Sequence, residues 1–174
     1  MLFRSEPGKG SLFWFTARLN PTEGPVDEAP ADFDYGIKDY TGVRVLLAED
    51  NEVNREIAAE LLNKVGVSPD LATNGQEAVQ MVNDHHYDLI LMDVQMPEMD
   101  GLEATRVIRA MNNEKGEPAA RQNNTPIVAM TANVFEEDRK ACLKAGMDDF
   151  LAKPVRPSKL YSMIERWASK SLDS

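Results

Sequence analysis

The sequence predicts an α/β domain with a doubly wound, five-stranded parallel sheet, preceded by a shorter N-terminal piece. Three observations support this fold class. Short apolar runs recur along the chain, and their length is typical of strands that are buried on both faces. Segments with a helical spacing of apolar residues separate these runs. The resulting alternation of strand and helix is the pattern of a parallel sheet covered by helices on both sides.

The first half of this domain is expected to contain two strands and two helices. The apolar run at 43–48 is the first strand, and residues 53–65 form a helix whose apolar side chains share one face. Gly66 is the expected C-cap of that helix, because glycine adopts the left-handed backbone conformation easily. A weaker strand is predicted at 70–72, and a second helix at 76–83.

The middle of the domain contains its most apolar strand. Residues 87–93 form this third strand, and residues 103–111 follow as the third helix. Residues 112–125 are polar and include Gly116 and Pro118, so a long surface loop is expected there.

Two further strand and helix pairs complete the predicted sheet. The fourth strand is at 126–130, and the fourth helix at 135–145 is ended by glycine. The fifth strand is at 149–152, and the last helix is at 158–169, with Ser158 as its N-cap.

Composition limits the classes of function. The chain has 174 residues, 43% of them hydrophobic, and a formal net charge of −10. Nucleic-acid binders usually carry a basic face, so no nucleic-acid partner is expected. No apolar run reaches the ~20 residues of a membrane helix, so no direct membrane contact is expected. The single cysteine, Cys142, is interpreted as a buried apolar side chain in a cytoplasmic protein.

The N-terminal part of the chain differs from the rest. Residues 1–20 contain a glycine-rich turn between two candidate strands, the second at 12–19, which predicts a β-hairpin. Residues 21–41 are rich in proline, glycine and acids and are interpreted as a linker. The α/β domain itself is assigned to residues 42–171.

Polar side chains follow the apolar runs at the ends of four strands. They are Glu49 and Asp50, Asp93, Thr131 and Lys153. Ligands of open parallel sheets bind beyond the carboxyl ends of the strands, so these groups are expected to converge. Such acids can hold Mg²⁺, and Mg²⁺ beside a carboxylate and a lysine suits phosphoryl chemistry.

Each of these residues also has a simpler structural interpretation. Asp93 could be a turn residue before Met96 and Pro97, and Asp50 with Asn51 could cap the first helix. Lys153 could be a solvated amine, and Thr131 a turn residue. In the functional interpretation, Asp93 is the nucleophile that forms an acyl phosphate. His85 and His86 are expected at the surface.

The domain as a whole resembles the receiver domain of bacterial two-component response regulators. The motifs that carry the resemblance are residues 45–51, 93–101, 129–132 and 150–154, in this order and at these separations. The resemblance implies a flavodoxin-like (βα)5 fold in which Asp93 is the phospho-acceptor. It also implies Mg²⁺ at Glu49, Asp50, Asp93 and the Gln95 carbonyl. Three further roles are implied, namely the switch hydroxyl, the switch aromatic and the phosphate-pairing amine, held by Thr131, Phe150 and Lys153.

The N-terminal segment has a resemblance of its own. Residues 5–15 look like the last hairpin of a histidine-kinase ATPase domain, which would make the chain the C-terminal part of a hybrid sensor histidine kinase. ATP-binding boxes are not recognisable, so ATP binding by this chain is not expected. The expected partners are a phosphohistidine donor of a histidine kinase and a histidine phosphotransfer protein. A cytoplasmic location is expected, whether or not the parent kinase is anchored in a membrane.

Three other classes of protein fit the sequence less well than a receiver. An aspartyl-phosphate phosphatase also uses a strand-end aspartate and Mg²⁺, but it generally needs a second acid where Gln95 stands. A docking module that never turns over phosphate is opposed by the complete set of site residues. A dinucleotide-binding domain is disfavoured because no Gly-x-Gly-x-x-Gly follows the first strand.

Overall fold

The computed structural model describes residues 2–6, 10–14, 38–114, 125–132 and 135–168. The chain divides into two compact units, Met1–Asp34 and Tyr35–Ser174. The first unit contains strands β1 (Leu2–Glu6) and β2 (Gly10–Trp14), which pair as an antiparallel hairpin. The hairpin agrees with the glycine turn in the sequence, although the second strand was expected at 12–19 and residues 15–19 lie outside the described part. Its origin in a kinase domain stays a prediction.

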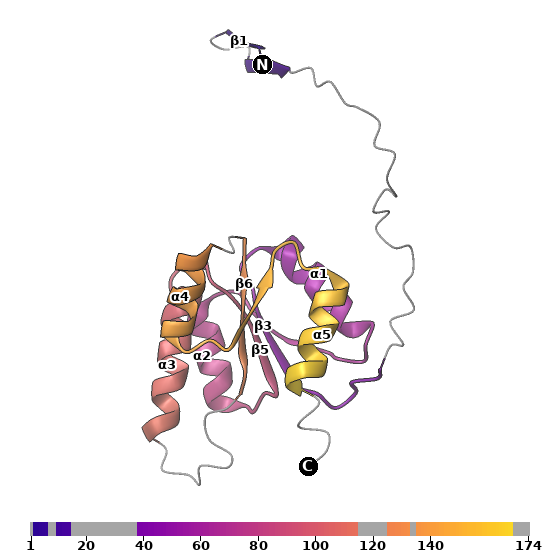
Figure 1. Ribbon diagram of the computed structural model, residues 1–174, viewed down its shortest axis with the longest axis vertical. Coiled ribbons are helices and arrows are strands. Elements are labelled where there is room, and N and C mark those ends of the chain that lie inside the picture. Colours follow the sequence, from indigo (N-terminus) through magenta and orange to yellow (C-terminus); the bar gives the residue numbers. More distant parts are fainter. Residues whose placement is uncertain (1, 7–9, 15–37, 115–124, 133–134, 169–174) are drawn as a thin grey trace. The chain divides into compact units, whose positions relative to one another are not determined.

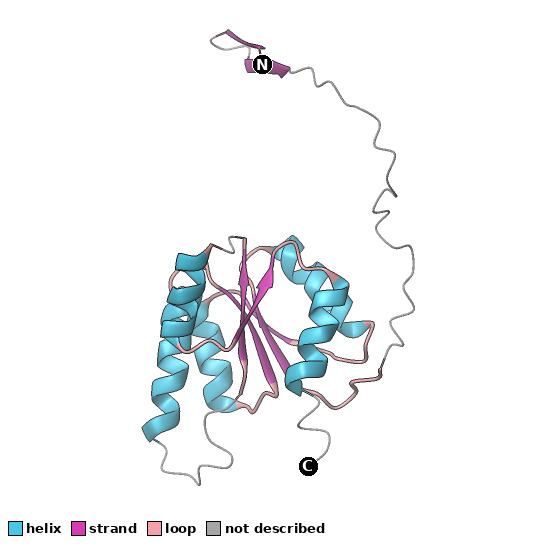
Figure 2. Cartoon of the chain, in the orientation of Figure 1, coloured by secondary structure: helices cyan, strands magenta, loops and turns pink. Residues whose placement is uncertain are grey.

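The second unit contains a single parallel sheet of five strands in the order β4-β3-β5-β6-β7 (Figures 1 and 2). The strands are β3 (Val45–Ala48), β4 (Asp70–Ala72), β5 (Leu89–Asp93), β6 (Ile127–Thr131) and β7 (Asp149–Ala152). The chain winds outward in both directions from β3, so the predicted doubly wound α/β fold is confirmed. Such sheets bind ligands where the strand order switches direction, which here is between the carboxyl ends of the neighbouring strands β3 and β5.

Helices cover both faces of this sheet (Figure 1). One face is covered by α1 (Glu52–Asn63) and α5 (Pro157–Ala168). The other face is covered by α2 (Gly75–Asp84), α3 (Gly101–Glu114) and α4 (Glu136–Ala145). Among the residues that the structure describes, each helix is too short or too polar to cross a lipid bilayer.

The strands supply both cores because their side chains alternate with a period of two. In β3, Val45 and Leu47 belong to the core under α1 and α5, while Leu46 and Ala48 belong to the core on the opposite face. All four side chains are buried. Burial on both faces explains why the strands read as unbroken apolar runs and not as alternating patterns.

Two of the predicted helix caps need correction. Gly146 is the left-handed C-cap of α4, as expected, with φ of 104°. For α1 the C-cap is Lys64, and Gly66 (φ 82°) lies two residues further on, where its N–H donates to the Asn63 carbonyl. The last helix begins at Pro157, so Ser158 lies inside its first turn and is not the N-cap. Proline is favoured at the first helical position because its missing N–H would have no partner there.

The end of the predicted linker packs on the sheet domain. Tyr40 is buried, and its backbone N–H donates to the Val65 carbonyl at 2.9 Å. Lys38 forms an ion pair with Glu165 of α5 at 2.5 Å. Residues shortly before residue 42, where the predicted domain begins, therefore already contact that domain.

Tyr87 gives a pH prediction for the fold. Its hydroxyl donates to Asp70 at 2.9 Å, and burial together with this hydrogen bond raises the pKa of Tyr87 to about 12. Because the folded state disfavours the phenolate, this stabilisation is present below the unfolded pKa of about 10 and is lost as pH rises through 12. An ultraviolet titration of tyrosine ionisation should show a step near 12 that Tyr87→Phe removes. An unchanged step in the variant would contradict the assignment.

Candidate functional site

The predicted polar side chains meet in one cleft at the carboxyl edge of the sheet. The cleft has a volume of about 400 Å³. Its lining includes Glu49, Asp50, Asp93, Gln95, Thr131 and Lys153. The sequence placed these groups at the ends of different strands, and the parallel order of β3, β5, β6 and β7 brings them together.

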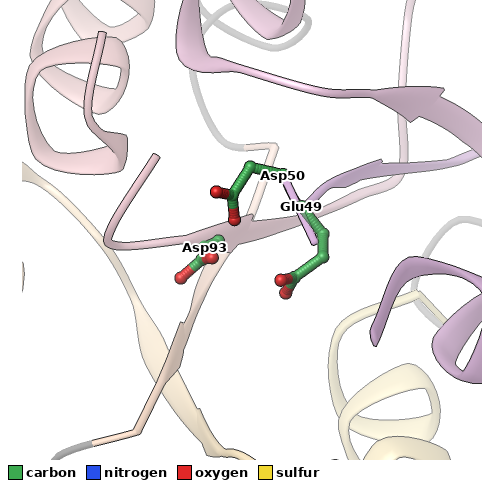
Figure 3. Close-up of side chains that lie close together, drawn as sticks. All are labelled: Glu49, Asp50 and Asp93. Carbon is green, nitrogen blue, oxygen red and sulfur yellow. The ribbon is translucent and has the colours of Figure 1, made fainter. Parts of the chain in front are cut away.

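Three carboxylates lie beside one another in this cleft (Figure 3). Glu49 and Asp50 follow β3, and Asp93 ends β5; each offers an oxygen within 4.8 Å of the others. Glu49 and Asp93 are buried, at 2% and 4% exposure, whereas Asp50 is exposed. Buried acids of this kind require a compensating positive charge.

Lys153 supplies part of that charge. Its ammonium lies 2.6 Å from Glu49 Oε2 and 2.6 Å from Asp93 Oδ2. The lining of the cleft contains one ammonium and four carboxylates, since Asp138 joins the other three, so negative groups are in excess there. An all-oxygen donor set with excess negative charge fits Mg²⁺, which takes carboxylate, carbonyl and water oxygens. The residues present therefore fit the metal that the sequence predicted.

The pKa of Asp93 reflects these opposing influences. Burial raises the pKa of the carboxyl, and the charge of Glu49 acts in the same direction. Hydrogen bonds from Lys153 and from the Gln95 backbone N–H, at 3.1 Å, act in the opposite direction. The net shift is upward, so ionisation of the Asp93 carboxyl is less favourable in the folded protein than in the unfolded chain.

The remaining predicted residues lie where the sheet order requires. Thr131 ends β6 and is nearly buried, with 9% exposure. Phe150, in β7, is half-buried, and the guanidinium of Arg139 lies 4.8 Å from its ring centre. The peptide bond between Lys153 and Pro154 is cis, an isomer that the sequence left open. His85 and His86 are exposed at the end of α2 and do not line the cleft.

The structural interpretation of these residues holds, and it leaves other atoms for the functional one. Asn51 is the N-cap of α1 and accepts a hydrogen bond from the Asn54 backbone N–H at 3.1 Å. Asp93 accepts from the Gln95 backbone in a turn while its second oxygen faces Lys153. Helix capping by Asn51 therefore does not use the carboxylates of Glu49, Asp50 and Asp93.

Two supporting residues were not identified from the sequence, and a third, Gly101, was noted only as the last residue of the motif at 93–101. Asn54 donates to Glu49 Oε1 at 3.2 Å, and Arg55 Nη1 donates to the Glu49 carbonyl at 2.9 Å. Gly101 packs so tightly on Asp93 that an added Cβ would lie 2.0 Å from the Asp93 carbonyl oxygen. The sequence offers only their spacing as a signal. Asn54 and Arg55 lie about one helical turn after Asp50, and Gly101 lies eight residues after Asp93.

Comparison with known proteins gives a consistent picture. Residues 45–165 match the family described as response regulator receiver domain. The chain is 39% identical over 163 residues to the aerobic respiration control sensor protein ArcB of Escherichia coli K12, covering 94% of this chain and 20% of that protein. It spans only 6% to 20% of the length of the histidine kinases that it matches.

Two examples illustrate the solved structures that are similar to this chain in fold and sequence. One is the receiver domain of the Saccharomyces cerevisiae response regulator Ssk1 in complex with the histidine phosphotransfer protein Ypd1, with a TM-score of 0.69 and 36% identity over 75% of this chain and 91% of that one. The other is the receiver domain of the Pseudomonas aeruginosa sensor histidine kinase PA1611, with a magnesium ion in its active site cleft. Its TM-score is 0.63 at 40% identity, covering 73% of this chain and 98% of that one.

Proposed function

Because this chain belongs to the family of response regulator receiver domains, we propose that Asp93 accepts a phosphoryl group from a phosphohistidine. The observation that carries the proposal is the pairing of a buried strand-end aspartate with Lys153 at 2.6 Å, inside a cleft of further carboxylates. No other aspartate of the described residues combines burial, a lysine partner and a place in the lining of the cleft.

The reaction is a transfer between two covalent carriers. A carboxylate oxygen of Asp93 forms a bond to phosphorus while the phosphorus–nitrogen bond of the donor breaks. The donor imidazole leaves and recovers a proton from solvent. The product at Asp93 is an acyl phosphate, and its reversal returns the group to another imidazole.

The side chains around Asp93 have separate tasks. Lys153, already within ion-pair distance of Asp93, pairs with an oxygen of the transferred group. Mg²⁺ would be held by Glu49, Asp50, Asp93 and the Gln95 carbonyl, and when bound it neutralises negative charge on the phosphoryl oxygens. Thr131, at the end of β6, donates its hydroxyl to a phosphoryl oxygen.

The signal is proposed to leave through the surface of α4, β7 and α5. When Thr131 moves toward the phosphoryl group, it vacates space into which the ring of Phe150 can rotate. Arg139 of α4 stacks on that ring, so rotation changes the surface that α4 presents. Phenylalanine has no hydroxyl, so this ring forms no hydrogen bond in either position.

The proposed partners follow from the same chemistry. The donor is the phosphohistidine of a histidine kinase, and the acceptor after Asp93 is a histidine phosphotransfer protein of the kind that binds the Ssk1 receiver. The hairpin at the start of the chain, followed by a linker and the receiver, is the order expected in a hybrid histidine kinase. We propose a cytoplasmic location for this domain, with neither nucleic acid nor membrane as a direct partner.

A labelling experiment tests the proposed acceptor. The protein is treated with acetyl phosphate in Mg²⁺ or in EDTA, and its intact mass is measured. We expect the mass of one phosphoryl group to be gained in Mg²⁺ alone. Borohydride reduction of the acyl phosphate should then convert Asp93 to homoserine, which peptide mass mapping locates.

Two outcomes would contradict the proposal. Homoserine at another aspartate would move the acceptor away from Asp93. Failure to bind either the phosphoryl group or beryllofluoride, in protein shown to be folded, would favour a docking module that does not turn over phosphate.

A further inference from the structure

The chain between β3 and α1 is held by a side chain outside the acidic cluster. β3 ends at Ala48, and the Glu49 N–H makes one more sheet-like bond, to the Ala72 carbonyl at 3.0 Å. The carbonyls of Glu49 and Asp50 both accept from Arg55 Nη1, at 2.9 and 3.2 Å. A single guanidinium nitrogen on α1 therefore fixes the main chain of two successive acidic residues.

The two acids depend on this main chain to different degrees. Both carboxylate oxygens of Glu49 are held, one by Asn54 at 3.2 Å and the other by Lys153 at 2.6 Å. The Asp50 carboxylate is exposed, and in the part of the chain that the structure describes no hydrogen bond to it is seen. Its direction is therefore set by the backbone that Arg55 holds, and the two side chains leave this backbone along different directions (Figure 3).

We propose that Arg55 is a positioning residue for the divalent cation of the proposed receiver site, with Asn54 performing the same task for Glu49. The inference rests on the proposed function. Holding carboxylates in place before the cation arrives removes the ordering cost from binding, and loss of such outer contacts typically weakens metal affinity 10–100-fold. Arg55 touches neither the metal nor the phosphoryl group in this scheme.

Charge alone predicts the opposite effect. Arg55 places a positive charge next to the cluster, and like charges repel, so its removal would strengthen the binding of a cation. Positioning predicts weaker binding after the same change. The sign of the change in affinity therefore separates the two accounts.

The test is a Mg²⁺ titration of the metal-free chain, followed by the backbone amide signals in nuclear magnetic resonance spectra. Arg55→Met keeps most of the stem but removes the donors and the charge, and we expect its dissociation constant to rise about tenfold. Arg55→Lys keeps the charge and a donor and should bind within about threefold of the unsubstituted chain. Arg106→Met, on the exposed surface of α3, is the matched control and should leave the constant unchanged.

A second variant and a metal-free measurement complete the test. Asn54→Leu removes the donor to Glu49 without changing the net charge, so weaker Mg²⁺ binding by this variant cannot result from a change in charge. This variant also tests the positioning role if Arg55→Met does not fold. In metal-free protein, Arg55→Met should speed hydrogen exchange at the Glu49 amide.

The outcomes distinguish this inference from the proposed function. Equal or tighter Mg²⁺ binding by both Arg55→Met and Asn54→Leu, with normal binding by the unsubstituted chain, would overturn the positioning role and leave the proposed function intact. Absence of Mg²⁺ binding in the unsubstituted chain would overturn the metal site of the proposed function, and the positioning role with it.

Discussion

Replacing Asp93 with asparagine is expected to abolish phosphoryl transfer. In the absence of divalent cations, the same change is expected to raise the free energy of unfolding. The amide is not a nucleophile toward phosphorus, so no acyl phosphate forms. Stability rises because three carboxylates lie within 4.8 Å of one another beside one ammonium, and burial already raises the pKa of Asp93. Lys153 keeps Glu49 as a partner at 2.6 Å, so no buried charge is left alone. We expect a gain of about 1 kcal/mol.

The measurement combines intact mass with urea unfolding in EDTA and in Mg²⁺. Asp88→Asn is the control, because it makes the same change at the opposite end of β5, where Asp88 accepts from the Arg44 backbone N–H at 2.8 Å. That variant should be phosphorylated normally and lose up to about 1 kcal/mol. Stoichiometric phosphorylation of Asp93→Asn, or its strong destabilisation in EDTA, would contradict the role given to this cluster.

The effect of Mg²⁺ on these variants follows by linkage. A ligand that binds only the folded state stabilises it by RT ln(1 + [L]/Kd), which is about 2.7 kcal/mol at one hundred times Kd. The unsubstituted chain should gain stability in Mg²⁺, whereas Asp93→Asn should gain much less. In EDTA, Asp93→Asn is expected to be the more stable protein. In saturating Mg²⁺, the difference in free energy of unfolding between the two proteins should become smaller or change sign.

The fold was predictable because its signal lies in local patterns. Runs such as 89–92 are buried on both faces, so they read as continuous apolar strands whichever helices cover them. Strand ends could be predicted to converge because parallel strands point the same way. Glu49, Asp93 and Lys153 therefore meet as expected, although they are far apart in sequence.

The supporting contacts were not predictable in the same way. Ser158 was wrongly predicted as the N-cap of the last helix because serine is a common capping residue. The helix begins one residue earlier, at Pro157, and proline is itself favoured at the first helical position. In the sequence, Arg55 is indistinguishable from other charged residues of a surface helix. Only the structure shows that the carbonyls of Glu49 and Asp50 point toward it. Tyr40 lies at the end of the predicted linker, where an aromatic side chain could dock on the next domain, and only the position of the Val65 carbonyl shows where it does so. Such contacts depend on distances between elements, and a pattern along the chain does not contain them.

Gly101→Ala is expected to be the most destabilising single-methyl change near the site. An added Cβ would lie 2.0 Å from the Asp93 carbonyl oxygen and 3.0 Å from Met92 Cγ. The oxygen belongs to the main chain at the end of a central strand, and the Gly101 N–H is bonded to the Val94 carbonyl at 3.1 Å. Neither partner can move alone, so we expect a loss of about 3 kcal/mol, measured by urea unfolding.

Gly42→Ala separates steric contact from backbone strain. Gly42 has a φ of 99° but nothing within 4 Å of an added Cβ, so the same methyl group should cost only the left-handed conformation, about 1 kcal/mol. A smaller loss for Gly101→Ala than for Gly42→Ala would contradict the close contact. If the predicted order holds, the glycine after Asp100 is required because the start of α3 lies directly on the backbone of Asp93. Asp93 would then be constrained at two places. Its backbone carbonyl packs against Gly101, which has room there only because it lacks a side chain, and its carboxylate pairs with Lys153.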